Sequence, residues 1–153
     1  MTKKKWVLYL WVAVLLPAIS GCGGNRYEHR AELIKEQVSS FYGHLESGQT
    51  ENAVFSNQRI EQLAMESEEY LLRRVGQMSH DERTQEWKII KTAKETAAEN
   101  WLALARYFTQ MGEYESARRT YTRLIETYDD SAYQIYVKRA SAGLRDLELI
   151  LSP

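Results

Sequence analysis

The sequence predicts an all-α protein of about five helices, arranged as antiparallel hairpins after a short targeting segment. Apolar residues recur at steps of three and four through most of the chain, which is the spacing that places side chains on one face of a helix. Glycines at positions 48 and 112 interrupt this pattern, and it restarts directly after each of them. Helices that stop and restart over so few residues must fold back on each other.

The first 21 residues have the composition of a secretory signal. Three lysines at positions 3–5 precede an apolar run from Trp6 to Leu16, and small residues follow before Cys22. The run is too short for a spanning helix, which needs about 20 apolar residues. Without this segment, 17 basic and 21 acidic residues remain, a formal charge of −4. No basic patch typical of nucleic-acid binding survives, and the remaining residues suit a single domain, 26–153.

A first helix is predicted from Arg26 to Ser47, after a short tether formed by residues 22–25. Asn25 and Glu28 have the spacing of a capping box, in which each side chain bonds a free amide of the first turn. Its apolar stripe would consist of Leu33 or Ile34, Val38, Phe41 and Leu45. Gly48 is expected to end this helix and Thr50 to cap the next.

The second helix is predicted to continue to a break at residues 76–80. Its stripe would contain Ile60, Leu63, Ser67, Tyr70 or Leu71, and Val75. The segment from Gly48 to Ala53 resembles the segment from Gly112 to Ala117, with glycine, glutamate and alanine at the same offsets. Two interpretations stay open for residues 26–75, namely a degenerate repeat and a plain helical hairpin.

A third, long helix is predicted from Asp81 to Met111. Ser79 and Glu82 form a second capping-box pattern, with acids in the first turn where the helix dipole favours them. Apolar residues then keep helical spacing without an intervening glycine or proline. Large aromatic side chains are mostly buried anchors, so Trp87 and Trp101 are both expected in the core.

Residues 98–131 carry the clearest pattern in the chain. Trp101, Leu104, Phe108 and Met111 lie on one helix face, and Gly112 can take the left-handed conformation that ends a helix. The pattern then restarts, and alanine 117 within it allows two helix axes to approach closely. The residues that carry the pattern are Trp101, Leu104, Ala105, Phe108, Gly112, Tyr114, Ala117, Tyr121, Leu124 and Tyr128.

These positions resemble one repeat of the tetratricopeptide-repeat (TPR) family, whose repeat is 34 residues long. Two positions depart from the family pattern: Asp129 stands where a proline is usual, and Leu124 fills a position that is usually small. The resemblance implies a short TPR-like array that binds another protein.

A last helix, residues 132–151, is predicted to cap this array. Ser131 and Gln134 have capping-box spacing, and Gly143 inside the helix implies a close approach to a neighbouring helix. Charged residues cover its opposite side, as is typical of the terminal helix of a stacked array. The join from Tyr128 to Tyr133 resembles the junctions between repeats in envelope lipoproteins such as the BamD family. The apolar face of this last helix would consist of Tyr136, Ala140, Leu144, Leu147 and Leu151.

Cys22 is the only cysteine, and it follows Ile19-Ser20-Gly21. This tetrapeptide resembles the lipobox of bacterial lipoproteins, which implies that Cys22 is modified with lipid and becomes the mature N-terminus. A lone cysteine is otherwise most often a small buried apolar residue. Gly23, in place of the aspartate that retains lipoproteins in the inner membrane, favours a location in the cell envelope, anchored to the outer membrane and facing the periplasm.

The TPR resemblance also implies where a partner protein would bind. In that family the first helix of each repeat lines a concave groove, and the matching positions are Glu99, Leu102, Arg106, Thr109 and Gln110. Leu102, Arg106, Thr109 and Gln110 form the predicted partner-binding site, since helical spacing places them away from the core stripe. The alternative is that these residues are ordinary surface.

No catalytic, cofactor or small-molecule motif is found in the sequence. His29, His44 and His80 lie far apart, whereas a metal site needs several converging ligands. We therefore expect a non-enzymatic, cofactor-free lipoprotein that acts as a scaffold or adaptor in envelope or secretion-complex assembly. The alternative is a cell-wall enzyme, or a regulator of a peptidoglycan enzyme, with a buried glutamate as its acid. The arginine pairs 73–74 and 118–119 are interpreted as surface charge or as contacts for lipid headgroups or an acidic partner.

Overall fold

The structure, a computed structural model, describes residues 22–152, and their side chains from residue 26 onward. In this range the all-α prediction is confirmed, with no strand among the described residues. The elements are α1 (Cys22–Glu46), α2 (Thr50–Arg74), the 3-10 turn η1 (Val75–Gln77), α3 (His80–Gln110), α4 (Tyr114–Thr127), the 3-10 turn η2 (Ser131–Tyr133) and α5 (Gln134–Leu151). The predicted signal segment, residues 1–21, lies outside the described residues.

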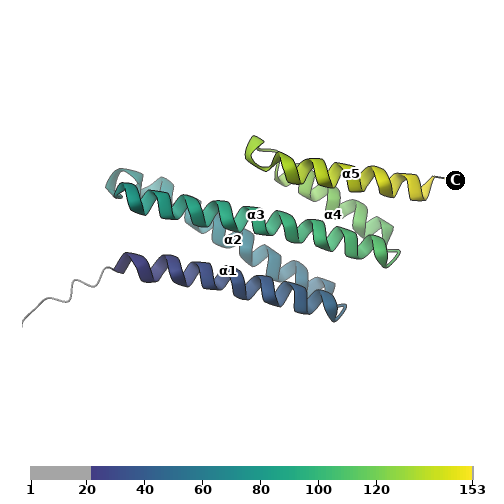
Figure 1. Ribbon diagram of the computed structural model, residues 1–153, viewed down its shortest axis with the longest axis horizontal. Helices are drawn as coiled ribbons and strands as arrows, with labels where there is room; N and C mark the ends of the chain where they lie inside the picture. The colour runs from purple at the N-terminus through teal and green to yellow at the C-terminus, as the bar shows by residue number, and fades with distance from the viewer. Residues whose placement is uncertain (1–21, 153) are drawn as a thin grey trace, which may run out of the picture.

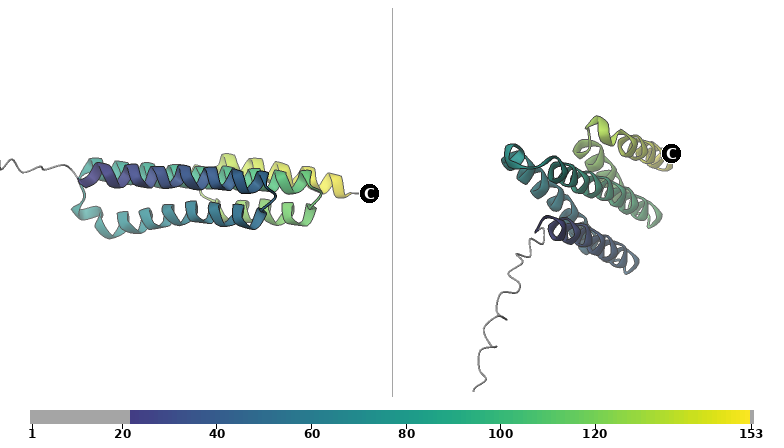
Figure 2. Two further views of the ribbon diagram at one scale, coloured as in Figure 1. Left: turned by 90° about the horizontal axis from the view of Figure 1, so that it is seen from below. Right: turned by 60° about the vertical axis from the view of Figure 1, so that its left-hand side comes forward.

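The five helices pack in two layers, and each helix is antiparallel to the next one along the chain (Figure 1). Each helix packs against the next one along the chain, and α3 also contacts α1 and α5. Seen from below, α1, α3 and α5 form one layer, and α2 and α4 form the other (Figure 2). The first helix of each hairpin therefore lies in the same layer, and α3 is central to the fold.

Two short turns connect the hairpins, and both use a glycine in the left-handed region. Gly48 has a φ of 71° and Gly112 a φ of 75°. This backbone conformation is disfavoured for residues with a Cβ atom, which explains why glycine stands at both sites. The predicted ends of the first and third helices are confirmed at these two turns.

The core is built from the stripes that the sequence predicts. Trp101, Leu104 and Phe108 of α3 are buried, as are Tyr121 and Leu124 of α4, and all five belong to one hydrophobic cluster. Ala53 and Ala117, near the start of the second helix of each hairpin, are fully buried. Small residues at these positions let the paired helices approach closely.

Gly143 confirms the predicted close approach of the last helix. A Cβ atom at this position would lie 2.5 Å from the ring of Tyr121 on α4. Such a distance is far below van der Waals contact. The glycine is therefore required by packing between α4 and α5. The close packing that it permits offsets the cost of about 1 kcal/mol that glycine imposes on a helix relative to alanine.

The capping box predicted at the start of α3 is confirmed, and three other cap predictions are wrong. Ser79 accepts a bond from the Glu82 amide while the Glu82 carboxylate accepts from the Ser79 amide. Asn25 lies inside α1, which starts at Cys22, so residues 22–25 continue the helix instead of forming a separate tether. The N-cap of α2 is Gln49 and not Thr50, and Asp130, not Ser131, caps η2 before α5.

The expected burial of Trp87 is also wrong. Trp101 is 2% exposed, but Trp87 is 59% exposed. Met111 and Val75, at the ends of their stripes, are exposed as well. These residues keep helical spacing with the core, but no neighbouring helix extends far enough to cover them.

Buried polar side chains that were not predicted from the sequence connect the two layers. Asn57 of α2 donates to the Ala97 carbonyl of α3 at 3.0 Å and accepts from Asn100 at 3.0 Å. Buried polar groups need such partners, because an unpaired amide in the core costs about 1–3 kcal/mol. The two asparagines therefore hold α2 and α3 in one register.

Among the helices of residues 22–152, none is long and apolar enough to cross a membrane.

Candidate functional site

The four residues predicted to bind a partner do not form one surface. Leu102 is fully buried in the core, so it cannot contact a partner and its prediction is wrong. It faces inward because α3 has neighbours on several sides, whereas the sequence pattern assumed one buried stripe. Thr109 is half-buried, and its hydroxyl donates to the Ala105 carbonyl of its own helix at 2.9 Å.

Arg106 and Gln110 are the two predicted residues that remain exposed. Glu99, which the resemblance also placed in the groove, is instead used within the fold. Arg139 of α5 donates to both oxygens of Glu99, at 2.5 and 2.8 Å. This two-point contact joins α3 to α5.

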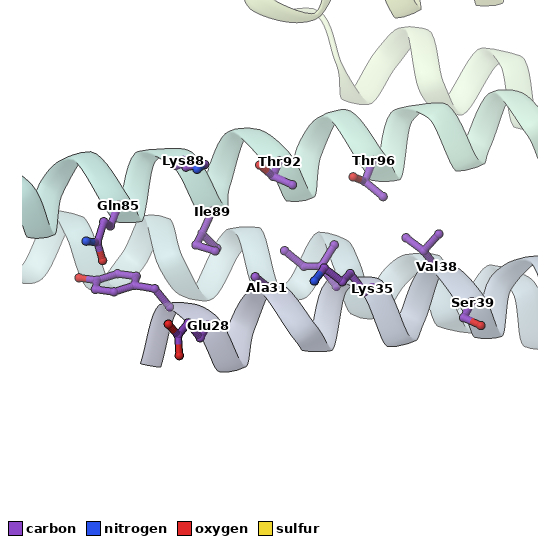
Figure 3. Close-up of a pocket in the computed structure, with 12 residues that line it drawn as sticks. Glu28, Ala31, Lys35, Val38, Ser39, Gln85, Lys88, Ile89, Thr92 and Thr96 are labelled. Atoms are coloured by element: carbon purple, nitrogen blue, oxygen red, sulfur yellow. The ribbon is translucent and has the colours of Figure 1, made fainter. Parts of the chain in front are cut away.

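A groove of about 750 Å³ lies between α1 and the first half of α3 (Figure 3). Ile89, Thr92 and Thr96 point from α3 toward α1, and Ala31 and Val38 point from α1 toward α3 (Figure 3). The residues that line it are Tyr27, Glu28, Ala31, Ile34, Lys35, Val38, Ser39, Gln85, Lys88, Ile89, Thr92 and Thr96. Its contribution from α1 spans 13 residues, about 18 Å of helix at 1.5 Å per residue step.

The groove has an apolar floor and polar edges. Ile34 and Ile89 are buried at its base, and Ala31 and Val38 are half-buried beside them. Charged side chains of both signs stand at the edges: Glu28, Lys35 and Lys88 are exposed. An apolar base with a few polar groups around it is the usual composition of a binding site.

Gln110 lies on the same side of α3 as this groove. It follows Thr92 by 18 residues, about five full turns at 3.6 residues per turn. Arg106 follows Thr92 by two heptads, so it is displaced by only about 40° from the same line. The predicted residues that stay exposed therefore extend the α3 wall beyond the groove, toward its C-terminal end.

The α1 wall of the groove was not predicted from the sequence. The apolar stripe of α1 was identified, but all of it was assigned to the core. Ala31, Ile34 and Val38 lie on the same narrow face as Phe41 and Leu45, at steps of three and four, so nothing in the sequence separated the groove residues from the core residues. Part of that face packs on α2, and the remainder borders the groove.

Glu86 is the buried glutamate that the enzyme alternative requires, and its surroundings are those of a structural cross-link. Its carboxylate pairs with Arg26 and with Arg30, the latter at 2.9 Å. Arg30 also donates to Ser67 at 2.8 Å, so the cluster joins α1, α2 and α3. Glu86 does not line the groove.

Glu61, in the middle of α2, forms a second cross-link. It accepts from the Trp101 indole at 2.8 Å, the Tyr128 hydroxyl at 3.0 Å and the Arg123 guanidinium at 3.0 Å. Burial, together with the nearby Glu61 carboxylate, raises the pKa of Tyr128 above its ordinary value. The Tyr128 hydroxyl therefore stays protonated and acts as a donor.

A second, shallower hollow lies between α4 and α5, and it carries both signs of charge. Arg118, Arg119, Arg123 and Glu126 of α4 line it together with Glu148 of α5. Arg118 also pairs with Glu115 at 2.8 Å. A mixed surface of this kind has no clear preference for an anion.

No group of three or more histidine, cysteine or acidic residues suited to a metal ion occurs within residues 22–152. Comparison with protein-family models, curated proteins and solved structures finds no match to this chain.

Proposed function

We propose that this protein is a membrane-anchored helical scaffold that holds a segment of another protein in the α1–α3 groove. The observation that carries the proposal is the groove itself, which is formed by the first helices of two successive hairpins. The resemblance of residues 98–131 to a TPR supports it, since that family binds partners along the same layer of helices. The proposed setting is the cell envelope, with the partner belonging to an envelope or secretion assembly.

The groove suits a helical or extended segment with spaced apolar residues. Ala31, Ile34 and Val38 recur at steps of three and four along its α1 wall. A partner helix with apolar residues at the same steps would place them on this floor, which is the common mode of helix-in-groove recognition. The lysines and the glutamate at the edges would then select for complementary charge.

The anchor in this proposal is lipid on Cys22. The support is the basic start, the short apolar run and the tetrapeptide Ile19-Ser20-Gly21-Cys22. Because α1 starts at Cys22, the groove would begin within about two helical turns of the membrane surface.

Site-specific photo-crosslinking tests the groove. A benzoyl-phenylalanine at Thr92, inside the groove, is expected to crosslink the partner, and one at Gln110 should crosslink it if the partner extends along α3. The matched position is Gln62, which is exposed on α2 in the opposite layer. Crosslinks from Gln62 alone would place the partner on the wrong layer and contradict the proposal.

A blocking substitution separates binding from proximity. Thr92→Arg puts a long cation into the groove and is expected to abolish co-purification of the crosslinked partner, while Gln62→Arg leaves it unchanged. Both variants should keep the wild-type helical circular dichroism spectrum, because both positions are exposed. Retention of the partner by Thr92→Arg would show that the groove is not its site.

The anchor is tested by mass spectrometry of the mature N-terminus. The wild-type protein should begin at Cys22 and carry lipid, and Cys22→Ala should remain an uncleaved, unmodified precursor. A processed chain that starts elsewhere, or an unmodified Cys22, would rule out the lipobox interpretation.

A further inference from the structure

Three large apolar side chains are exposed at the end of the molecule where α1 begins. Leu72 is 78% exposed, Val75 is 47% exposed and Trp87 is 59% exposed. Single exposed apolar residues are normal on protein surfaces, but a group of them marks an interaction site. We refer to these three residues as the α2–α3 shelf.

The shelf residues lie on one face of the α2–α3 pair. Glu68 of α2 forms an ion pair with Lys94 of α3, which marks this face on both helices. Leu72 and Val75 follow Glu68 by four and seven residues, and Trp87 precedes Lys94 by seven. Steps of four and seven keep side chains on the same side of a helix, so Leu72 and Trp87 point out from the face that the ion pair marks. Val75 follows directly after α2, in η1.

The shelf is exposed because α4 and α5 do not reach far enough along α3 to cover it. α3 has 31 residues, but α4 has only 14. The Lys94 ammonium lies 5.9 Å from the ring centre of Tyr133, directly before α5, so α5 begins beside the middle of α3. Figure 1 shows α4 and α5 beside only the second half of α3, which leaves its first half without a neighbour on that side.

The start of α1 lies at the same end of the molecule. The Tyr27 hydroxyl donates to the Glu82 carbonyl at 3.4 Å, and the Arg26 guanidinium lies 3.6 Å from the ring centre of Tyr70. These contacts hold the beginning of α1 against the end of α2 and the beginning of α3. Cys22 precedes Tyr27 by five residues, about 7.5 Å along the helix axis.

In the proposed function, the membrane anchor therefore holds the chain at this end. The apolar run from Trp6 to Leu16 precedes Cys22 by only five residues, so a bilayer would lie near the start of α1 whether that run is retained or replaced by lipid. Arg74 stands between Leu72 and Val75, and Lys91 follows Trp87 by one turn, and both are exposed. Tryptophan, aliphatic side chains and basic residues together suit the interface of an anionic bilayer.

We propose that the α2–α3 shelf rests in the headgroup region of the membrane to which the protein is anchored. This inference rests on the membrane anchor of the proposed function and adds an orientation to it. Trp87 lies at the level of the headgroups, with Leu72 and Val75 beside it, and Arg74 and Lys91 contact anionic lipid. The α3–α4 turn and the C-terminus of α5, at the other end of the molecule, then point away from the bilayer (Figure 1).

Tryptophan fluorescence tests this placement directly. The full-length protein, processed or not, is reconstituted into vesicles of phosphatidylethanolamine and phosphatidylglycerol with either ordinary or brominated acyl chains. The difference between the wild type and Trp87→Phe isolates the emission of Trp87 from that of the other three tryptophans. We expect brominated lipid to remove most of the Trp87 emission and to leave the buried Trp101 unaffected.

A matched pair of variants tests the role of the shelf. Leu72→Asp places a charge on the shelf and should restore most of the Trp87 emission in brominated vesicles. Phe55→Asp changes an equally apolar residue, 63% exposed on the same helix but at its opposite end, and should leave the quenching as in the wild type. Equal quenching in all three proteins would overturn the role assigned to the shelf.

The outcomes separate this inference from the proposed anchor. A protein with lipid on Cys22 whose Trp87 is not quenched would overturn the shelf and leave the anchor intact. A protein without lipid on Cys22 whose Trp87 is still quenched would overturn the lipidation and support the shelf. Protection of Trp87 from aqueous acrylamide without any lipid, together with a dimer in sedimentation, would show that a second copy of the chain covers the shelf and would overturn membrane contact.

Discussion

The two hairpins of this protein have turns of the same geometry, but their helices differ in length. In both turns the glycine amide bonds a carbonyl three residues back, and the following amide bonds one five residues back. The residues after the glycines, Gln49 and Glu113, have nearly equal backbone angles of −87°, 66° and −84°, 61°. This is the Schellman arrangement at a helix end, reproduced twice in one chain.

Beyond the turns the hairpins diverge. The helices α1 and α2 have 25 residues each, whereas α3 has 31 and α4 has 14. The second hairpin packs around large aromatic residues, Trp101, Tyr121 and Tyr128, and the first buries Phe41 and Ile60 with several small residues. The six residues of each turn, 44–49 and 108–113, therefore specify its geometry. The lengths of the helices decide which surfaces the next hairpin covers.

The largest effect is expected at the two alanines that follow the turns. Ala53→Trp and Ala117→Trp should each lower the free energy of unfolding by about 3 kcal/mol or more, since overpacking costs typically about 1–3 kcal/mol and a tryptophan ring is a large insertion. The measurement is urea unfolding followed by circular dichroism. The controls are the neighbouring residues, Asn52→Trp and Ser116→Trp, which are exposed and half-exposed.

If Ala53→Trp is tolerated while Ala117→Trp is not, the two hairpins differ in how closely their helices approach. If all four variants unfold at the same urea concentration, close approach at the alanines is not what holds either hairpin.

The next effect concerns the glycines of the turns themselves. Gly48→Ala and Gly112→Ala should each cost about 1–2 kcal/mol, because a Cβ atom disfavours the left-handed conformation. The two losses should be equal, since neither position lacks room for a methyl group. Gly76→Ala is the control, because its φ is not positive and nothing lies near its added Cβ. Unequal losses would show that the matching geometry of the turns does not mean matching energies.

Two glycines inside helices should respond in opposite directions. Gly43→Ala, in α1 and without neighbours, should stabilise the protein by up to about 1 kcal/mol through helix propensity. Gly143→Ala should destabilise it by about 1 kcal/mol net, because contact with the buried Tyr121 ring outweighs that gain. Adding Tyr121→Leu should make the alanine at 143 less costly, and an additive double mutant would rule out the proposed clash.

The smallest effect is expected at the N-terminus of α3. This helix has a side-chain cap, whereas the N-cap of α2 forms no side-chain bond. Bonds from the Ser79 amide and hydroxyl lower the pKa of Glu82 below its ordinary value of 4.5. A lowered folded pKa means that the contribution to stability is present above about pH 4.5 and is lost as the pH falls through the folded value. Glu82→Gln should therefore remove part of the loss of thermal stability seen below that pH. Glu51→Gln in the first turn of α2 should change the profile less, and an equal change would show that general charge, not the cap, is responsible.

Most of the helical framework could be predicted from the sequence because it depends on neighbours in the chain. The left-handed glycines, the Ser79 capping box and the apolar steps of three and four all act within one or two turns, so the sequence contains their partners. The caps that were predicted wrongly depend on the path of the chain as well as on residue type. Asp130 and Ser131 are both plausible caps by type, and only the path of the chain into η2 selects Asp130.

None of the residues that line the groove was predicted to bind a partner, because the groove depends on elements that are distant in the sequence. Arg106 and Gln110 are exposed as expected, but the groove takes seven of its twelve lining residues from α1, more than 45 residues away in the sequence. Glu99 could not be excluded from the site in advance, because its partner, Arg139, comes from the last helix.

The sequence by itself determined that the chain is helical, that Gly48 and Gly112 make the turns and which stripe of α3 forms the core. The tertiary structure alone decided that Leu102 is buried, that Trp87 is exposed and that Glu86 is enclosed by two arginines of α1. The physical reason is that helical spacing defines which side chains share a face, whereas burial depends on whether another helix reaches that face. α3 is longer than the helices packed beside it, so the same apolar pattern is covered at Trp101 and open at Trp87.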